Sequence, residues 1–208
     1  MRDESRPMFG VLLLAAGRSS RMGQPKLLLP WAGTSILGHL LHQWRTLGAR
    51  QIAVVCANRD DTLGAELSRL CFAAENIIEN PMPERGMFSS IQCGAGWRGW
   101  VPDLTHWAIV LGDQPHLRLE TLTGLLAFAA NHSGQVCQPA YRGKAAHPVV
   151  LPKPVFQALA TSQAETLKEF LSAGEVCRFD CEDSGLELDL DRPEDYQRAL
   201  ALAGLTTR

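Results

Sequence analysis

Short apolar runs alternate along this chain with segments in which apolar residues recur at helical spacing. Residues 9–15 (FGVLLLA) form a continuous apolar run, which is typical of a strand that is buried on both faces of a sheet. Leu37, Leu40, Leu41 and Trp44 recur at spacings i, i+3, i+4 and i+7, so they share one face of a predicted helix. The pattern therefore predicts a buried strand that is followed, after a polar loop, by an amphipathic helix.

The alternation of strand and helix continues along the rest of the chain. Further strands are predicted over residues 51–57, 76–79, 106–111, 135–140, 148–151, 175–181 and 186–190. Further helices are predicted over residues 63–71, from residue 89 or 90, over 122–129, 153–160 and 163–172, and from Pro193, which suits a first helical turn. This alternation predicts the α/β class, with a mostly parallel sheet covered by helices on both faces. The turn-rich stretch over residues 135–190 is expected to carry a small antiparallel elaboration.

The composition is that of an ordinary globular domain. The chain has 208 residues, of which 46% are hydrophobic and 20% charged, and this argues against disorder, collagen and coiled coil. We expect residues 8–208 to form a single domain and residues 1–7 a disordered tail. The formal net charge is −2, so the chain lacks the basic excess that nucleic acid or an anionic membrane would favour.

The cysteines and the apolar segments bear on the cellular compartment. Six cysteines are scattered without a CxxC motif, so we expect reduced thiols and a cytoplasmic protein, without disulfides or a structural zinc site. The apolar segment over residues 8–17 would also suit the core of a signal peptide. However, Arg2 and Arg6 stand with Asp3 and Glu4, so the preceding segment has no excess positive charge and the strand is favoured. No apolar run approaches the length of a membrane-spanning helix.

The loop after the first strand carries candidate phosphate-binding chemistry. It contains two glycines, which let a backbone approach a ligand closely, and the cations Arg18, Arg21 and Lys26, which can neutralise a polyphosphate. Successive backbone N–H groups in such a loop can cradle phosphate oxygens. The loop matches neither the GxGxxG fingerprint nor the Walker A pattern. The alternative is a solvated basic loop, which the cluster of cations and glycines directly after a buried strand disfavours.

Three aspartates follow later apolar segments and are candidate metal ligands. Asp113 ends the apolar run over residues 107–111, where a carboxylate beside a phosphate loop would suit Mg²⁺, although a helix cap is an equal alternative. Asp189 and Asp191 would point to the same face of the predicted strand, so that one of them would complete the metal site. The acidic residues that follow Pro193 suit an ordinary helix start.

Two weaker candidates are Ser90 and His147. Ser89 and Ser90 lie near a predicted helix start, where capping is the default role of a hydroxyl. His147 precedes a proline and follows a cationic turn, and a single histidine in that position is more often structural than catalytic.

Together these segments resemble the nucleotidyltransferases of the MobA/MocA-like type. Residues 14–26 match the signature LAAGxSxRMGxPK of that family without a gap. Residues 112–115 (GDQP) resemble its metal-binding aspartate loop, residues 86–91 its GMxxS element, residues 146–148 its GHP element and residues 189–196 its DxDTPEDY element. The order of the elements is that of the family, and the resemblance spans roughly residues 9–200.

The resemblance implies a Rossmann-like three-layer α/β/α sandwich and a Mg²⁺-dependent transfer of a nucleoside monophosphate from a nucleoside triphosphate to a phosphate-bearing acceptor, with release of pyrophosphate. It assigns the nucleotide site to Leu14, Ala15, Ala16, Gly17, Arg18, Ser19 and Ser90. It assigns catalytic contacts with the triphosphate to Lys26 and Arg21, the metal to Asp113 and Asp191, and the acceptor side to His147.

The resemblance also suggests substrates. Cytidylyltransferases of this family resemble LAAG, whereas its guanylyltransferases usually read LAGG, so Ala16 favours CTP. The implied acceptor is molybdopterin, the organic part of the molybdenum cofactor, and a molybdoenzyme or its chaperone would receive the product. The alternatives are a sugar or alditol phosphate as acceptor, GTP as donor, or a non-catalytic nucleotide- or cofactor-binding chaperone.

The chain departs from the family pattern at three positions. Ala146 replaces the usual glycine before His147, Phe88 puts a bulky ring in the GMxxS stretch, and Arg192 replaces the usual threonine before Pro193. The first two lie on the expected acceptor side, so they bear on the acceptor more than on the nucleotide chemistry.

Overall fold

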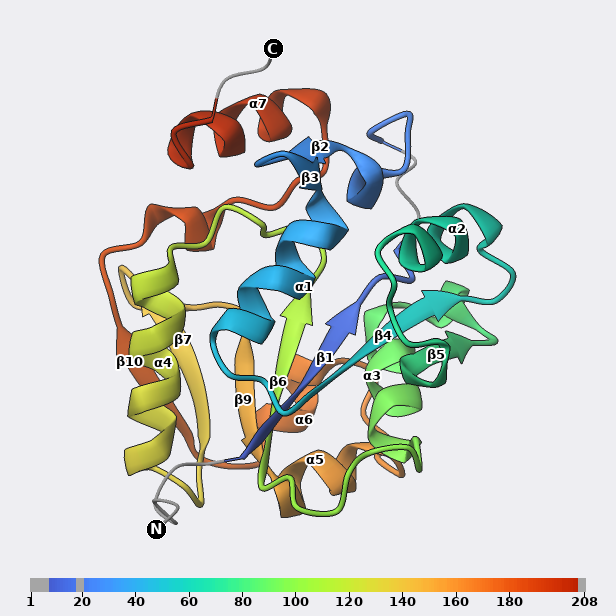
Figure 1. The fold of residues 1–208 in the computed structure, drawn as a ribbon. Helices are drawn as coiled ribbons and strands as arrows, with labels where there is room; N and C mark the ends of the chain where they lie inside the picture. Colours follow the sequence, from blue (N-terminus) through green and yellow to red (C-terminus); the bar gives the residue numbers. More distant parts are fainter. Residues whose placement is uncertain (1–7, 18–20, 206–208) are drawn as a thin grey trace, which may run out of the picture.

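The computed structural model describes residues 8–17 and 21–205. The predicted tail over residues 1–7, together with Arg18 and Ser19, lies outside the described residues. Within the described part, the main sheet has the strand order β10-β7-β9-β6-β1-β4-β5, with β8 paired to β7 (Figure 1). The strands are β1 (Phe9–Leu14), β4 (Gln51–Ala57), β5 (Ile77–Asn80), β6 (His106–Leu111), β7 (Val136–Tyr141), β8 (Lys144–Ala145), β9 (Val149–Pro152) and β10 (Val176–Asp180).

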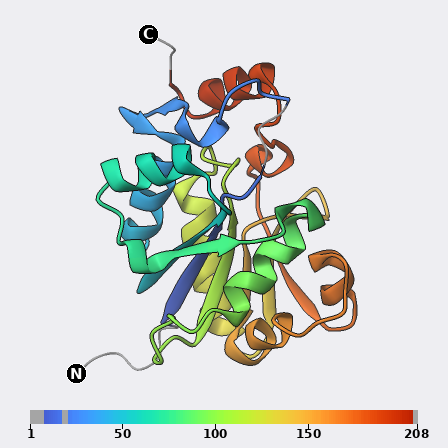
Figure 2. The ribbon, with the colours of Figure 1, turned by 90° about the vertical axis from the view of Figure 1, so that its right-hand side faces the viewer.

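Helices cover both faces of this sheet, as Figure 2 shows from the side. The α-helices are α1 (Ile36–Thr46), α2 (Asp61–Arg69), α3 (Met87–Gly96), α4 (Leu119–Asn131), α5 (Lys153–Leu159), α6 (Leu167–Ser172) and α7 (Pro193–Leu202). Apolar residues of α1, α2, α4 and α7 belong to one core cluster, and those of α3, α5 and α6 belong to the other. The predicted three-layer α/β/α sandwich is therefore confirmed.

Strand β1 lies inside the sheet and contributes side chains to both core clusters. Val11 and Leu13 enter the cluster that contains α1 and α4, whereas Leu12 and Leu14 enter the cluster that contains α3 and α5. Alternate side chains of a strand point to opposite faces, so a strand with helices on both sides must be apolar throughout. This explains the continuous apolar run over residues 9–15.

The sheet is mostly parallel, with an antiparallel part where it was expected. Strand β1 pairs in parallel with β4 and β6, β4 with β5, and β7 with β10. Strand β9 lies antiparallel between β6 and β7, and β8 pairs antiparallel with β7. In the main sheet, the strands of the antiparallel pairs thus lie within residues 135–190, except for β6, which is one of the partners of β9.

One predicted strand is wrong and one hairpin was not predicted. Residues 186–190 do not form a strand, because a 3₁₀ turn, η4 (Ser184–Glu187), occupies the first part and the rest joins no sheet of the described residues. Leu188 and Leu190 are nevertheless buried. The small hairpin of β2 (Pro30–Trp31) and β3 (Thr34–Ser35) turns through Ala32 and Gly33, both at positive φ. Two-residue strands are too short to leave a period-2 pattern.

No helix within residues 8–17 and 21–205 is both long and apolar enough to span a membrane. All six cysteines are free of disulfides, as predicted.

Candidate active site

The loops after β1 and β6 start side by side. Leu14 and Leu111 are register partners in the parallel pair, so both strands end at the same edge of the sheet. Gly112 follows immediately, and its N–H donates to Leu14 O at 3.2 Å. A Cβ at this position would lie 2.9 Å from Leu14 O and 2.8 Å from the side chain of Leu27. Glycine is therefore required at 112 for Asp113 to approach the first loop.

A pocket of about 410 Å³ opens at this edge. Seven predicted site residues line it: Leu14, Ala15, Ala16, Gly17, Lys26, Ser90 and Asp113. Its other lining residues are Leu27, Pro83, Glu84, Gly86, Met87, Leu111 and Gly112. The pocket thus unites the ends of β1 and β6 with the start of α3, and ligands of open α/β sheets bind at such strand ends.

Cations and carboxylates alternate at the edge of this pocket. Lys26 Nζ lies 2.6 Å from Asp113 Oδ2 and 3.8 Å from Asp191 Oδ1. Arg21 forms an ion pair with the same Asp191 at 2.9 Å, and its side chain is 65% exposed. Arg21 is not among the residues that line the pocket. The structure therefore brings four predicted residues into one charged cluster, which lies at one side of the pocket.

The carboxylates of this cluster fit a divalent cation. Asp113 Oδ1 is buried and has no hydrogen-bond partner in the described part of the chain, so an oxygen remains for a further ligand. Within residues 8–17 and 21–205, no group of three or more His, Cys, Asp or Glu side chains is arranged to hold a metal. Mg²⁺ commonly uses only one or two carboxylates, with substrate phosphates and water completing its coordination. Asp113 and Asp191 suit that mode of binding.

Asp189 contacts the loop after β6 through Gln114. Gln114 Nε2 donates to Asp189 Oδ1 at 2.9 Å. Burial, followed by the nearby charge of Asp113, raises the pKa of the Asp189 carboxyl above its usual range. The two aspartates of the DxD segment therefore have different partners: Asp191 pairs with Lys26 and Arg21, and Asp189 pairs with Gln114.

Ser89 and Ser90 do not cap a helix, contrary to the default expectation. Helix α3 starts at Met87, and no side chain caps it. Both hydroxyls instead accept hydrogen bonds from Asn80 Nδ2, at 2.8 and 2.9 Å, and Asn80 is buried at the end of β5. Asn80 Oδ1 also accepts from Met82 N at 2.9 Å. Asn80 thereby ties the end of β5 to the start of α3 and orients the pocket residue Ser90.

His147 lines a second cavity of about 400 Å³. This cavity is lined by Leu111, Gln114, Tyr141, Lys144, Ala145, Ala146, His147, Leu186, Glu187 and Asp189. It shares Leu111 with the first pocket, so the two cavities adjoin at the end of β6. Burial lowers the pKa of His147, and its Nδ1 lies 3.4 Å from Ile109 O. His147 thus lines the second cavity and does not line the first.

Sequence reasoning gave no role to several residues that shape the site. Gln114 lies in the GDQP segment, but its hydrogen-bond partner Asp189 is 75 residues away in the chain. Asn80 could have been noticed as a polar residue between an apolar strand and Pro81. No local pattern points to Pro83 or Glu84 as pocket residues, whereas Met87 belongs to the GMxxS element but had no assigned role.

Comparisons with known proteins agree with this geometry. The family model described as MobA-like NTP transferase domain matches residues 11–177. The molybdenum cofactor cytidylyltransferase of Escherichia coli K12 is 28% identical over 190 residues, which cover 89% of this chain and 92% of that protein. The bifunctional protein GlmU of Pseudomonas putida GB-1 is 35% identical over 127 residues, and the match covers 58% of this chain but only 25% of GlmU.

Solved structures show the same fold. Rv0371c from Mycobacterium tuberculosis H37Rv superposes with a TM-score of 0.71 and 26% identity, covering 94% of this chain and 98% of that one. Rv0371c has also been solved in complex with manganese, and that structure has a TM-score of 0.70 at 24% identity, with 94% and 99% coverage. From the family match over most of the chain, we conclude that this protein belongs to the MobA-like NTP transferase family and is a nucleotidyltransferase of that type.

Proposed function

We propose that this protein transfers CMP from CTP to the phosphate of molybdopterin, releases pyrophosphate and uses Mg²⁺. The observation that carries the proposal is that residues 14–17, Lys26 and Asp113 line one and the same pocket. Similarity to the E. coli molybdenum cofactor cytidylyltransferase over most of both chains supports the choice of substrates. We also propose that residues 8–208 form one nucleotidyltransferase domain.

The proposed reaction is an in-line displacement at the α-phosphorus of CTP. An oxygen of the acceptor phosphate forms a new bond to the α-phosphorus, and the bond from that phosphorus to the bridging oxygen of the β-phosphate breaks. Pyrophosphate leaves with the electron pair of that bond. Because the acceptor oxygen is already anionic, no strong general base is needed. The protein therefore acts by positioning the reactants and by neutralising charge.

Lys26 and Arg21 supply positive charge in this scheme. The Lys26 side chain is only 15% exposed, so its charge is weakly screened and acts strongly on a phosphate in the pocket. Arg21 is more exposed and lies farther out, beside Asp191. We propose that both hold the triphosphate and that Lys26 stabilises the negative charge that grows on the leaving pyrophosphate.

Asp113 and Asp191 would hold the Mg²⁺, which when bound would neutralise phosphate charge. The unpartnered oxygen of Asp113 and the manganese complex of Rv0371c support a divalent cation at this edge. The second cavity, lined by His147 and Asp189, is proposed to receive the acceptor, because it adjoins the nucleotide pocket at Leu111.

The methyl group of Ala16 supports CTP as the donor. Ala16 lines the pocket and is 9% exposed, so its Cβ takes up space at the wall. A purine base is larger than a pyrimidine and would be crowded more by this group. We therefore expect an Ala16→Gly variant to gain binding of GTP relative to CTP.

The first test is thermal unfolding of the wild-type protein with CTP, GTP, ATP or UTP, each with and without Mg²⁺. A ligand that binds only the folded state raises the unfolding midpoint by mass action. For the wild type, we expect a selective Mg²⁺-dependent shift with CTP. For Ala16→Gly, we expect the shift with CTP to be weaker relative to the shift with GTP. A shift selective for GTP would contradict the donor assignment, and no shift with any nucleotide would favour a non-catalytic binding protein.

The second test addresses the acceptor. Anaerobic incubation with CTP, Mg²⁺ and molybdopterin should consume free molybdopterin and release pyrophosphate. Unchanged molybdopterin, together with pyrophosphate release from CTP and a sugar or alditol phosphate, would replace molybdopterin with that acceptor.

A further inference from the structure

Two segments beside the site run antiparallel and are joined by four hydrogen bonds. We call these segments, residues 113–118 and 183–190, the clasp. The bonds are Leu190 N to Asp113 O (3.1 Å), Gln114 Nε2 to Asp189 Oδ1 (2.9 Å), His116 Nε2 to Gly185 O (2.9 Å) and Arg118 N to Asp183 Oδ2 (3.1 Å). Residue numbers rise on one side as they fall on the other, so the bonds form an ordered ladder. Three of the four bonds use a side chain, which sets the clasp apart from a regular β-ladder.

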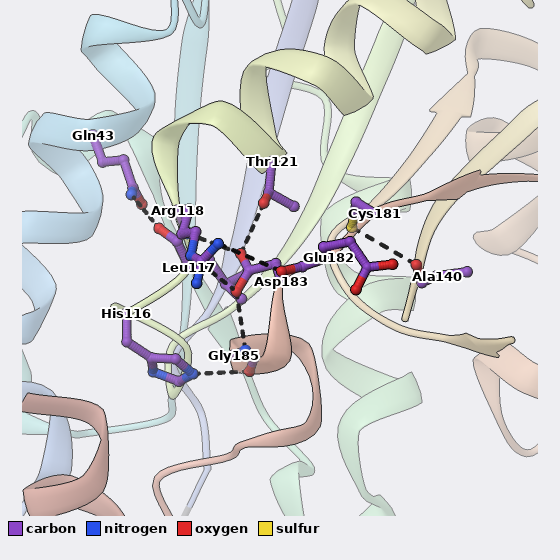
Figure 3. A network of polar contacts seen from close by, with 10 residues as sticks. All are labelled: Gln43, His116, Leu117, Arg118, Thr121, Ala140, Cys181, Glu182, Asp183 and Gly185. Carbon is purple, nitrogen blue, oxygen red and sulfur yellow. Dashed lines mark hydrogen bonds and ion pairs between the residues drawn. The ribbon is translucent and has the colours of Figure 1, made fainter. Parts of the chain in front are cut away.

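Asp183 anchors the end of the clasp opposite the bond from Leu190 to Asp113, and Figure 3 shows its contacts with Arg118, Thr121 and Gly185. It is 2% exposed. Its Oδ2 accepts from Arg118 N and from Thr121 Oγ1 at 2.8 Å, and its Oδ1 accepts from Gly185 N at 3.0 Å. The Arg118 guanidinium adds an ion pair at 3.9 Å. A buried carboxylate with this many donors is held in one place, because each lost bond would leave a buried polar group without a partner.

The packing around Asp183 leaves little room for the two segments to separate or slide. A Cβ on Gly185 would lie 2.9 Å from Asp183 Oδ1 and 2.9 Å from the His116 ring. Gly185 therefore permits the close approach of both residues. Close-packed elements of this kind transmit a shift at one end to the other.

The clasp is what positions the DxD segment. Strand β10 ends at Asp180, and within the described residues the segment 183–191 pairs with no strand of a sheet. Glu187 of this segment pairs with Lys144 of β8 at 2.8 Å, but the Lys144 side chain is 76% exposed. The last bond of the ladder, from Leu190 N to Asp113 O, ties the residue before Asp191 directly to Asp113.

We propose that Asp183 is a positioning residue of the reaction: by anchoring the clasp, it holds Asp191 opposite Asp113 and Lys26. The inference rests on the proposed function, since it takes Asp113 and Asp191 as the residues that hold the divalent cation. Asp183 touches neither the pocket nor the proposed cation, and it acts through the segment that it fixes. A purely structural aspartate in the same place would affect stability and leave cation affinity unchanged.

The test is a titration of the full-length protein with Mn²⁺ in the presence of saturating CTP, in which the binding of Mn²⁺ by CTP alone, measured without protein, is subtracted from the loss of the electron paramagnetic resonance signal of free Mn²⁺. Asp183→Asn keeps the side-chain volume but replaces one acceptor oxygen with a donor. Loss of groups that orient metal ligands typically weakens metal binding by about 10- to 100-fold, so we expect half-saturation at about tenfold higher Mn²⁺. Thr166→Ala is the matched control: it removes the hydroxyl that accepts from Glu169 N at the start of α6, outside the clasp, and should leave half-saturation unchanged.

A second variant keeps the test decisive if Asp183→Asn does not fold. Gln114→Ala removes the bond to Asp189 at the other end of the clasp and leaves the buried Asp183 network intact. It should raise the Mn²⁺ needed for half-saturation in the same direction. Wild-type half-saturation in every clasp variant that folds would overturn the role of Asp183 and leave the proposed function standing. Absence of Mn²⁺ binding by the wild type with CTP would overturn both.

Discussion

Lys26 Nζ lies 2.6 Å from Asp113 Oδ2, although the two residues are 87 positions apart in the chain. Their side chains are 15% and 20% exposed, so water and salt screen this pair less than an ion pair on the surface. Lys26 starts the 3₁₀ turn after the first loop, and Asp113 follows β6. The pair therefore joins the loop that we propose to bind phosphate to the loop that we propose to bind the cation.

Replacing Lys26 with alanine should lower turnover sharply. The loss of one preorganised group that stabilises transition-state charge typically costs about two to three orders of magnitude in kcat. We expect a fall of that size for Lys26→Ala, measured as pyrophosphate release from CTP in the presence of molybdopterin.

Arg69→Ala is the matched control for Lys26→Ala. The Arg69 side chain is 59% exposed and pairs with Glu66 within α2 at 2.7 Å, and neither residue lines the pocket. Its turnover should equal that of the wild type. Near-normal turnover of Lys26→Ala, with the control also normal, would show that Lys26 does not act on the leaving group.

Replacing Asp113 with asparagine should remove activity and the response to Mg²⁺ together. The change keeps the size of the side chain but removes the charge that favours a divalent cation. We expect turnover to fall by about two orders of magnitude or more, and Mg²⁺ should no longer enlarge the thermal shift produced by CTP. Asp103→Asn is the control, because Asp103 lies before the start of β6, at the opposite edge of the sheet, and pairs with Arg50. A fully active Asp113→Asn would move the cation site elsewhere.

Stability should fall as the pH drops below the usual pKa of histidine. Burial lowers the pKa of His106, and also that of His39, His116 and His147. In His106 the Nε2–H donates to Ser133 O at 2.9 Å, and the ring stays neutral in the folded state. Below a pH of about 6.5 the unfolded chain binds a proton at this position that the folded chain does not, so unfolding becomes easier as the pH falls.

Urea unfolding at a series of pH values measures this effect. Between the unfolded and the folded pKa, each such histidine contributes a slope of up to about 1.4 kcal/mol per pH unit. His106→Gln keeps a donor for Ser133 O but cannot take up a proton, so its free energy of unfolding should depend less steeply on pH. An unchanged slope would mean that His106 binds its proton equally in both states.

Two glycine-to-alanine changes in helices should have opposite effects on stability. A Cβ on Gly94 in α3 would overlap the side chain of Leu12, which is completely buried in β1. Overpacking of a core costs about 1–3 kcal/mol, so Gly94→Ala should lower the free energy of unfolding. Gly64 in α2 has no atom within 4 Å of such a Cβ, and there alanine should stabilise by about 0.5–1 kcal/mol. Chemical unfolding of both variants measures the difference, and stabilisation by Gly94→Ala would mean that α3 can move away from β1.

Local patterns in the sequence determined much of the fold. The apolar run over residues 9–15 predicted β1, and the spacing from Leu37 to Trp44 predicted α1, because burial on two faces and burial on one helical face leave different repeats. The motif over residues 14–26 also contains five of the residues that line the first pocket, namely Leu14, Ala15, Ala16, Gly17 and Lys26. Pro193 is predicted to open the last helix, and it is the first residue of α7, where the Asp195 carboxylate accepts from Arg192 N.

Only the tertiary structure decided which of these segments contact one another and through which polar groups. Residues 186–190 alternate in burial like a strand, yet they form a 3₁₀ turn and one side of the clasp, because their partner is the loop after β6 and no strand of the described sheet. The roles of Asn80, Gln114 and Asp183 likewise come from partners far away in the chain. A repeat in the sequence records which face of a segment is buried. Hydrogen bonds between distant polar groups depend on which buried surfaces meet, and that is determined only when the whole chain packs.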